Sequence, residues 1–327
     1  MSRPIFNVTI GGANISAAVS QRLLSLTVRD LAGDESDTFI LRLDDTIPRI
    51  PTPAPGDLVT VQMGYAETGL VDMGEFYVNE IELSGDPAWE MRVQGESGNM
   101  LSAMRTTRSD AWHEMTIAEI VSTIAGRNGW TPVIDPELGG IFIAHIDQRN
   151  TSDMHFLTLL AVEHRGVFKL TRGIAVFAKR GAATSITGLP IANLVITPED
   201  DVLNWRALFH RRGHHQELVG RWHDYDAAET VEQRVPGPGD EPNRTLSRRY
   251  PDETEATQAA MSESRRLGAV AGRLTLELIG RPTLFAEGFI TMTGFREPID
   301  GDWKIRMVEH QLDNSGYRTT VECELPE

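Results

Sequence analysis

Hydrophobic and polar residues alternate along much of the first hundred positions, which is the pattern of half-buried β-strands. Glycine and proline interrupt the alternation at Gly11-Gly12, in the run PRIPTPAPG and at Gly85-Asp86-Pro87. Short strands at such regular spacing predict a β-barrel or a β-sandwich. The predicted strands are IFNVTI, LLSLTVRD, DTFILRLDD, DLVTVQMGY, EFYVNEIEL and WEMRVQGE.

A helical period replaces the alternation in the run TIAEIVSTIAGRNG. Thr116 and Glu119 have the spacing of a capping box, which marks the start of a helix. Gly126 and Gly129 supply the stop. The apolar residues that recur at helical spacing are Ile117, Ile120, Val121, Ile124 and Ala125.

A second helix is predicted over SDMHFLTLLAVEHRG, with Ser152 as its N-cap and Gly166 just past its end. The strands VFKLTRG and IAVFAKRG complete this α+β segment near Gly181. Strands return near Leu194, and one more helix is predicted over PDETEATQAAMSESRRLG, whose acidic start and basic end suit the helix dipole. The stretch VPGPGDEPN between them predicts an exposed loop.

Two distant segments resemble each other. PTPAPGDLVTVQMGY, MGEFYVNEIEL and WEMRVQGE match PTLFAEGFITMTGF, DGDWKIRMVEHQL and YRTTVECEL in their order of glycines and strands. The triplet Gly-acidic-aromatic recurs as Gly74-Glu75-Phe76 and Gly301-Asp302-Trp303. Generic β-meanders also share such turns, but the common Pro-Thr start favours an internal duplication. The aligned strand residues are Val78 and Ile305, Ile81 and Val308, and Glu82 and Glu309.

A duplication predicts two similar β-modules that flank an α+β insert. The expected domains are residues 1–98, residues 99–190 and residues 191–327, the last with one helix near residues 253–268. Three such chains around an axis would present six similar modules, which gives a homotrimer pseudo-sixfold symmetry. The expected fold class is therefore β-rich α+β, with two β-barrel modules and an insert.

Composition narrows the class of protein. The chain has 327 residues, a formal net charge of -16 and a single cysteine, Cys323, which sits in an alternating run and is expected to be buried. No apolar run has the roughly 20 residues that span a bilayer, and the N-terminus lacks the apolar segment of a leader peptide. We expect folding inside the cell. The acidic charge argues against sequence-specific nucleic-acid binding, because phosphate contacts need clustered lysine and arginine.

Hydrolase signatures fail on inspection. HEMTI, at His113-Glu114, lacks the second histidine of a zinc protease, and GESGN lacks the spacing of a serine nucleophile elbow. Acidic runs such as Glu199-Asp200-Asp201 are interpreted as solvated turns, although a pair of carboxylates that meet only in space stays open. No catalytic, cofactor-binding or metal-binding residue is predicted, and His145, His155 and His164 are read as ordinary polar residues.

The run FHRRGHHQELVGRWHDYD is the strongest candidate for a metal site. On a regular strand His215 and His223 share one face while His210 and His214 share the other, and zinc needs three or four converging ligands. The neighbouring arginines would repel a dication, although a bulge at Gly213 could regroup the faces. We interpret the run as a strand with Leu218 and Trp222 toward the core, VEQRV as its partner strand, and its histidines and arginines at a subunit contact.

The chain as a whole resembles the phage late control D family, the baseplate hub proteins of contractile-tailed phages, which are related to the hub part of VgrG. The resemblance runs in order through most of the chain, although each motif alone is weak. Its residues are PIFNVTIGGANI, SDTFILRLDD, PAPGDLVTVQMGY, VDMGEFYVNEI, TIAEIVSTIA, HIDQRNTSDMHFLTLLA, GRPTLFAEGFITMTGF and IDGDWKIRMVEHQLDNSGYRTTVECEL. In that family the segment HIDQRNTSD is a structural connector.

The resemblance implies a trimeric hub with two tail-tube-like barrels per chain and no catalytic residues. Its expected partners are further copies of itself, the tail tube protein, the tape measure protein, the central spike protein and other baseplate proteins, with no membrane and no cofactor. It would be assembled in the host cytoplasm into the virion tail, with its acidic surplus lining a DNA channel. Two alternatives stay open: the hub of a phage-tail-like bacteriocin, gene-transfer particle or secretion system, and a tail-associated cell-wall hydrolase.

Overall fold

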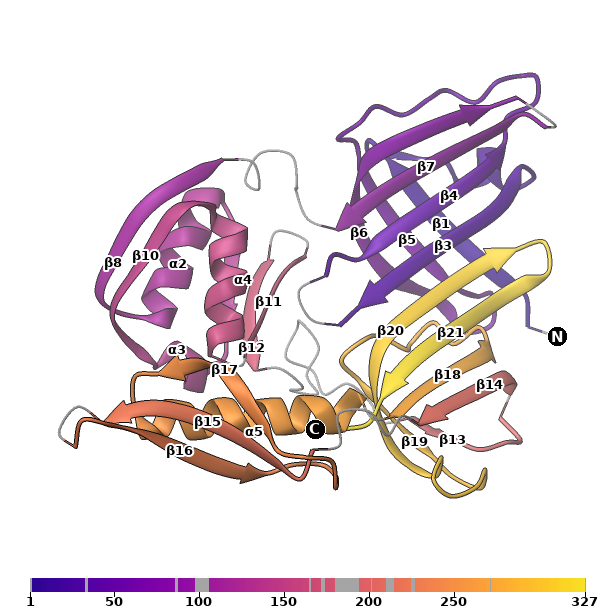
Figure 1. Cartoon of the computed structure of the whole chain (residues 1–327). Coiled ribbons are helices and arrows are strands. Elements are labelled where there is room, and N and C mark those ends of the chain that lie inside the picture. The colour runs from indigo at the N-terminus through magenta and orange to yellow at the C-terminus, as the bar shows by residue number, and fades with distance from the viewer. Residues whose placement is uncertain are drawn as a thin grey trace. The chain divides into compact units, whose positions relative to one another are not determined.

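A computed structural model gives the fold of the chain, which is β-rich with few helices (Figure 1). It describes residues 2–32, 35–85, 88–97, 106–164, 166–171, 174–179, 194–200, 202–209, 215–224, 227–270 and 272–326. The chain divides into two compact units that do not follow chain order. Unit 1 is Met1–Ala192, Glu277–Gly288 and Arg306–Val321, and unit 2 is Asn193–Leu276, Phe289–Ile305 and Glu322–Glu327.

The main sheet of unit 1 confirms the six strands predicted near the N-terminus. Its strand order is β3-β4-β7-β6-β5-β1-β2, and each strand is antiparallel to its neighbours in this order. The alternation places Phe39, Phe76 and Val93 on one buried face. The elements are β1 (Pro4–Ile10), β2 (Ala13–Asn14), α1 (Ser16–Val19), β3 (Leu23–Leu31), β4 (Thr38–Asp44), β5 (Leu58–Tyr65), β6 (Gly69–Ser84) and β7 (Glu90–Ser97).

The segment that follows packs two helices between strands (Figure 1). The predicted capping box is present at Thr116 and Glu119, and Gly129 ends the helix in the left-handed conformation at φ 73°, whereas Gly126 lies inside it. Ser152 caps the second helix as predicted. The elements are β8 (Thr107–Thr116), α2 (Ile117–Asn128), β9 (Thr131–Ile134), α3 (Pro136–Gly139), β10 (Phe142–Ser152), α4 (Asp153–Glu163), β11 (Gly166–Thr171) and β12 (Ile174–Lys179).

The long antiparallel pair β8–β10 was not predicted from the sequence. Most of its side chains are exposed or half-buried on both faces, so no alternation marks the strands. The pairing joins segments about 30 residues apart, which places Trp112 opposite Ile146 and His113 opposite His145. The segment HIDQRNTSD thus forms the end of β10 and the cap of α4.

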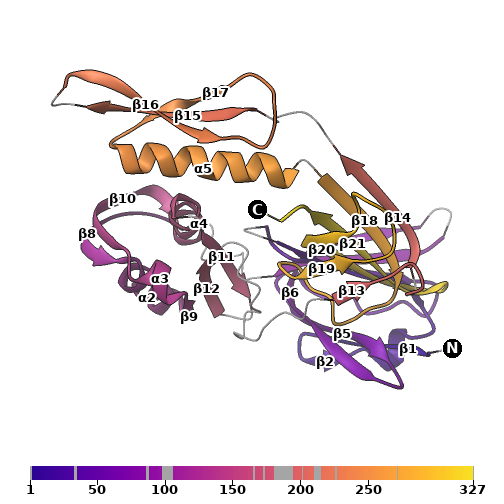
Figure 2. The same ribbon diagram turned by 90° about the horizontal axis from the view of Figure 1, so that it is seen from below.

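Unit 2 contains the last predicted helix, which continues two residues beyond the predicted end. Figure 2 shows α5 (Glu253–Val270) lying along one face of the sheet formed by β15, β16 and β17. Within the described residues, no helix combines the length and apolar character needed to cross a bilayer. The remaining elements are β13 (Leu194–Ile196), β14 (Val202–Phe209), β15 (Glu217–Asp224), β16 (Glu229–Pro236), β17 (Arg244–Tyr250), β18 (Gly272–Ile279), β19 (Phe289–Met292), β20 (Gly301–Asp313) and β21 (Gly316–Glu324).

The two segments of the predicted repeat have the same local structure. In β5–β6, Val59 pairs with Phe76 and Val61 with Gly74, and in β19–β20, Ile290 pairs with Trp303 and Met292 with Gly301. The two glycines adopt nearly the same left-handed backbone, with φ 127° at Gly74 and φ 130° at Gly301. These aligned apolar residues are all buried. The resemblance between the segments is therefore one of register and core position.

Candidate functional site

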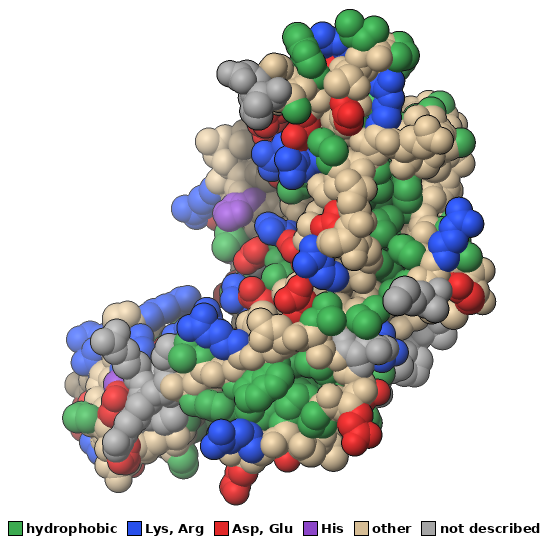
Figure 3. Space-filling view, turned by 90° about the vertical axis from the view of Figure 1, so that its right-hand side faces the viewer, with side chains coloured by type: hydrophobic (Ala, Val, Ile, Leu, Met, Phe, Trp, Pro, Cys, Tyr) green, Lys and Arg blue, Asp and Glu red, His purple; other side chains and the backbone are tan. Residues whose placement is uncertain are grey.

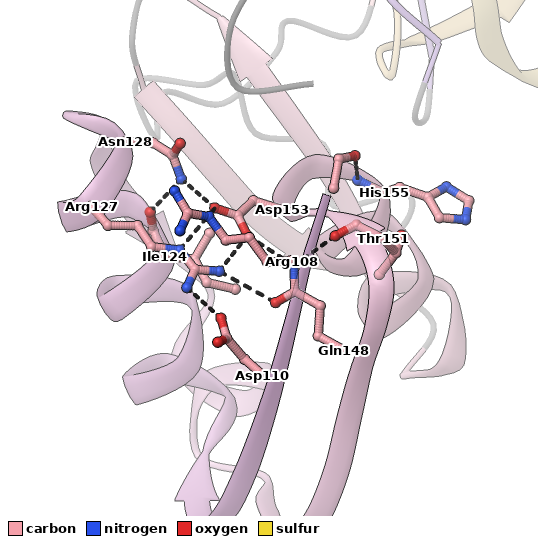
Figure 4. Close-up of polar contacts among 10 residues, drawn as sticks. Arg108, Asp110, Ile124, Arg127, Asn128, Gln148, Thr151, Asp153 and His155 are labelled. Carbon is pink, nitrogen blue, oxygen red and sulfur yellow. Dashed lines mark hydrogen bonds and ion pairs between the residues drawn. The ribbon is translucent and has the colours of Figure 1, made fainter. Parts of the chain in front are cut away.

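Asp153 is the centre of a buried polar cluster that joins both helices of the insert to the β8–β10 pair (Figure 4). Its side chain is only 2% exposed. Arg127, at the end of α2, donates through Nε to Asp153 Oδ2 at 2.8 Å and through Nη2 to Oδ1. Gln148 Nε2 donates to Asp153 Oδ1 at 2.9 Å, and Asn128 Nδ2 to Oδ2 at 2.7 Å. The Asp153 carboxylate therefore links α4, on which it lies, to α2 and β10.

The electrostatics of this cluster suit a structural clamp. Burial would raise the pKa of Asp153, but hydrogen bonds from Arg127, Gln148 and Asn128 and the charge of Arg127 bring it below its usual value. Arg127 also donates to Asp110 on β8 at 2.6 Å. Asp153 is thus ionised and fully engaged, with no proton to transfer at neutral pH.

A second buried ionic cluster surrounds Lys169 on β11. Its Nζ donates to Asp30 Oδ1 at 3.1 Å, to Asp37 Oδ1 at 2.8 Å and to the Leu31 carbonyl at 3.0 Å. Burial opposes ionisation of Asp30, but the charge of Lys169 and a hydrogen bond from the Ala286 amide lower its pKa. Burial and the Asp30 charge raise the pKa of Asp37 to about 7. The cluster ties the insert to the end of β3.

His310 is buried in unit 1 as a neutral imidazole. Its Nε2 donates to the Leu284 carbonyl at 3.0 Å, and its Nδ1 accepts from the hydroxyls of Tyr317 at 3.0 Å and Thr319 at 3.2 Å. Burial lowers the pKa of His310 to about 4, against the smaller opposing effects of the Leu284 carbonyl and the Asp30 charge. The ring accordingly acts as a neutral hydrogen-bonding bridge.

This burial predicts a loss of stability in acid. The folded pKa of about 4 lies below the unfolded value of 6.5, so unfolded chains bind the proton more readily. The free energy of unfolding contains the full contribution of neutral His310 above about pH 6.5. This contribution declines as the pH falls toward 4, by about 3 kcal/mol in all. Denaturant titrations of the wild type and of His310→Gln at pH 7 and pH 4 measure it. The wild type should lose about 3 kcal/mol more than the variant over this interval; equal losses would contradict the assignment.

His113 and His145 form a stacked pair across β8 and β10, with ring centroids 4.5 Å apart and Nδ1 atoms 3.1 Å apart. Asp147 Oδ1 lies 3.3 Å from His145 Nε2, but it is also bound by the exposed Arg149. In the described part of the chain, no three His, Cys, Asp or Glu side chains form a group that could hold a metal ion. Sequence reasoning treated these histidines singly and missed the pair.

The histidine run at residues 210–223 is only partly described, since His210, Arg211, Arg212, Gly213 and His214 lie outside the described residues. His215 Nδ1 donates to the Pro242 carbonyl at 2.8 Å, and His223 borders a hollow with Arg248 and Arg249. VEQRV is the partner strand, as predicted.

Leu218 lies in the core as predicted, whereas the predicted core position of Trp222 is only half-buried. Leu218 is fully buried against Ala260 and Leu267 of α5. Gly220 allows the helix backbone to approach, since a Cβ there would meet the Ala256 carbonyl oxygen at 2.3 Å. Trp222 follows on the same face but is only half-buried.

A polar hollow of about 510 Å³ lies on the solvent face of the unit 1 sheet. Cross-strand ion pairs lie along it: Arg29 with Glu309, Arg42 with Glu90 at 2.6 Å, and Arg92 with Glu82 at 3.7 Å. Three arginines oppose three glutamates, so this face is balanced in charge although the chain is acidic. No cation or anion is favoured there.

Cys323 is buried, as predicted, and burial together with Glu322 and Glu324 raises the pKa of its thiol. A neutral thiol in a core is a poor nucleophile. The polar groups described above are two buried ionic clusters, a buried neutral histidine and a charged strand face. Among the residues discussed, no nucleophile is paired with a base.

Comparison with known proteins identifies the kind of molecule. The model of the phage tail baseplate hub (GPD) family matches residues 55–316 of this chain. The chain belongs to the phage tail baseplate hub family. A probable baseplate hub protein of Escherichia phage 186 is 29% identical over 364 residues, covering 98% of this chain and 93% of the phage protein. The resemblance found in the sequence is confirmed, and the role of this chain is that of a baseplate hub protein.

Solved structures share the fold. A 43 kDa tail protein of prophage MuSo2 from Shewanella oneidensis has a TM-score of 0.78 at 15% identity, with 99% of this chain and 98% of that chain covered. An Escherichia coli component of the type VI secretion system has a TM-score of 0.60 at 12% identity, with 98% of this chain and 76% of that chain covered. The hub fold therefore extends from phage tails to secretion machinery.

Proposed function

We propose that this hub joins the tail tube and the tape measure protein to the central spike protein, as a homotrimer that surrounds part of the DNA channel. The match of register and burial between β5–β6 and β19–β20 carries the proposal. Two such modules per chain let three chains present six similar modules, the symmetry match that a hexameric tail tube requires. The expected division into residues 1–98, 99–190 and 191–327, with two tail-tube-like barrels, belongs to this proposal.

The role is structural in this proposal. The ionised, fully bonded Asp153 and the buried neutral Cys323 support it, because neither offers acid–base or nucleophilic chemistry. A tail-associated cell-wall hydrolase would instead clear peptidoglycan in a zymogram, and we expect no clearing by the purified chain.

Deletion of the gene from the phage or prophage that carries it is expected to abolish infectious particles, because the tube has no base on which to assemble. Expression of the chain in trans should restore the titre. Electron microscopy of the deletion lysate should show heads without complete tails. Complete tails and baseplates that lack this chain would contradict the proposed position between tube and spike.

A hub of a phage-tail-like bacteriocin, gene-transfer particle or secretion system is the second candidate, favoured by the fold shared with the type VI component. Nuclease-protected DNA in purified particles distinguishes a phage or a gene-transfer particle from the others. The net charge of -16 suits a channel through which DNA slides without adhering. A charge map of the assembled trimer tests that placement, and a basic lumen would overturn it.

A further inference from the structure

Two of the strand edges that lack a strand partner among the described residues are the outer edge of β14 and part of one edge of β6. In unit 2, the strand order β14-β18-β21-β20-β19-β13 ends at β14. In unit 1, β6 pairs with β5 through residues 69–77 and with β7 through residues 76–84, so the edge on the β5 side is unpaired over residues 79–84. Open strand edges are templates for another strand.

β14 occupies in unit 2 the place that β3 occupies in unit 1. The order β3-β4-β7-β6-β5-β1 corresponds to β14-β18-β21-β20-β19-β13, although β1 is antiparallel to β5 whereas β13 is parallel to β19. The sequences also match, with Leu-Thr-Val-Arg in β3 and Leu-Asn-Trp-Arg in β14. Two further residues along, Leu31 corresponds to Leu208.

In unit 1 the edge of β3 that corresponds to the open edge of β14 is occupied by β20. Residues 307–313 of β20 pair with it in antiparallel fashion, and Glu309 lies opposite Arg29 and forms an ion pair with it. The preceding residues of β20, 301–304, pair with β19. Gln311 lies opposite Thr27 in the same register.

β6 is the counterpart of β20, and its unpaired residues correspond to those that bind β3. Glu82 occupies the position of Glu309 in the repeat. In β20 the buried positions change parity between Ile305 and Val308, and in β6 the buried Val78 is followed by the half-buried Ile81 at the corresponding spacing. The unpaired end of β6 therefore resembles the edge that β20 uses at Ile81 and Glu82.

The exposure of β14 supports a missing partner. Its counterparts in β3, Leu26 and Val28, are 0% and 1% exposed, whereas Leu203 and Trp205 are 53% and 41% exposed. Figure 3 looks onto the side on which Figure 1 labels β13 and β14 and shows hydrophobic side chains gathered on this face. Leu83, at the unpaired end of β6, is 59% exposed. Uncovered apolar side chains on an edge strand mark an interaction surface.

We propose that residues 79–84 of β6 in one copy pair antiparallel with β14 of a second copy, as β20 pairs with β3 within a chain. The register places Glu82 opposite Arg206, Leu83 opposite Trp205 and Ser84 opposite Asn204. The inference rests on the proposed homotrimer and names its contact. Each copy offers one edge of each kind, so the contact is head-to-tail, and three such contacts would close the ring of the proposed homotrimer.

The charges of the two edges are complementary. Among the described residues, Arg206 forms no ion pair, while Glu82 has only a 3.7 Å contact with Arg92 and is 58% exposed. Directly opposed Arg and Glu stabilise a strand pair, as Arg29 and Glu309 do.

Disulfide cross-linking tests the register. The variant Ser84→Cys/Asn204→Cys, made with Cys323→Ala to remove the native thiol, should form covalent multimers under mild oxidation that disappear on reduction. Directly opposed residues of antiparallel strands have Cα atoms about 4.5 to 5.5 Å apart, within the range that a disulfide bridges. The matched control, Ser84→Cys/Leu208→Cys, moves one thiol four residues along the same strand, about 13 Å away, and should not cross-link. Circular dichroism verifies that both variants fold.

Charge reversal gives a second measurement. Glu82→Arg and Arg206→Glu should each weaken self-association about tenfold in sedimentation experiments, and the double variant should restore it. Arg149→Glu, a reversal at an exposed residue of the insert, should leave association unchanged.

Failure of this interface is distinguishable from failure of the proposed function. If the wild type associates but Ser84→Cys/Asn204→Cys cross-links no better than its control, the β6–β14 contact is wrong while the hub position stands. A chain that stays monomeric and uncross-linked at high concentration also overturns the contact. The position between tube and spike depends on the deletion experiment alone.

Discussion

Replacement of Asp153 by alanine is expected to lower the free energy of unfolding by about 3 to 5 kcal/mol. The carboxylate is 2% exposed and accepts hydrogen bonds from Arg127, Gln148 and Asn128. Its removal takes the buried carboxylate away from these three donors and leaves Arg127 with Asp110 as its remaining carboxylate partner. Buried donors that lose their acceptor cost more free energy than the hydrogen bonds themselves contribute. Guanidinium titration followed by far-UV circular dichroism measures the loss.

Asp147→Ala is the matched control, because Asp147 lies in the same segment but binds the exposed Arg149. An exposed ion pair contributes about 0 to 1 kcal/mol, so this variant should unfold near the wild-type midpoint. Equal losses for the two variants would show that Asp153 does not clamp the insert. Trp112 packs on Phe156 of α4 in the same core.

Replacement of Lys169 by methionine is expected to destabilise the chain by about 3 kcal/mol or more at neutral pH. The variant keeps the aliphatic packing but leaves Asp30 and Asp37 together without their cation. Two neighbouring carboxylates in a buried site repel each other when both are ionised, so the loss should shrink as the pH falls and they take up protons. Denaturant titration at pH 8 and pH 5 measures both effects.

Lys179→Met is the control on the adjacent strand β12. Its partner Glu137 is largely exposed, so the expected change is within about 1 kcal/mol and depends little on pH. A pH-independent loss in Lys169→Met would contradict the view that uncompensated carboxylates cause it.

Much of the secondary structure can be predicted from the sequence, because caps and strand alternation depend on neighbouring residues. The capping box at Thr116 and Glu119, the cap at Ser152 and the strand alternation of β3 to β7 depend on residues within a few positions. The repeat was also readable, since Gly74 and Gly301 require the same left-handed backbone. The hub family followed from the order of such motifs, and the family match confirms it.

The β8–β10 pair and the two ionic clusters were not predicted. Lys169 stands alone in an apolar strand, a signal that a buried partner must exist, but nothing in its neighbourhood names Asp30 or Asp37. Asp153 follows the N-cap of α4, where exposed acidic residues are common, so nothing in the sequence indicates that it is buried.

Short-range patterns specify most of the strands, the main helices, the repeat and the family of this protein, because periodicity, caps and glycine conformations depend on residues within a few positions of one another. The strands β8 and β10 carry no such pattern. Which strands pair becomes known only from the three-dimensional packing. The pairing of β20 with β3 joins residues about 280 positions apart, and only that pairing shows what the open edges of β6 and β14 lack. Contacts between distant segments depend on how the whole chain packs, and no local pattern specifies them.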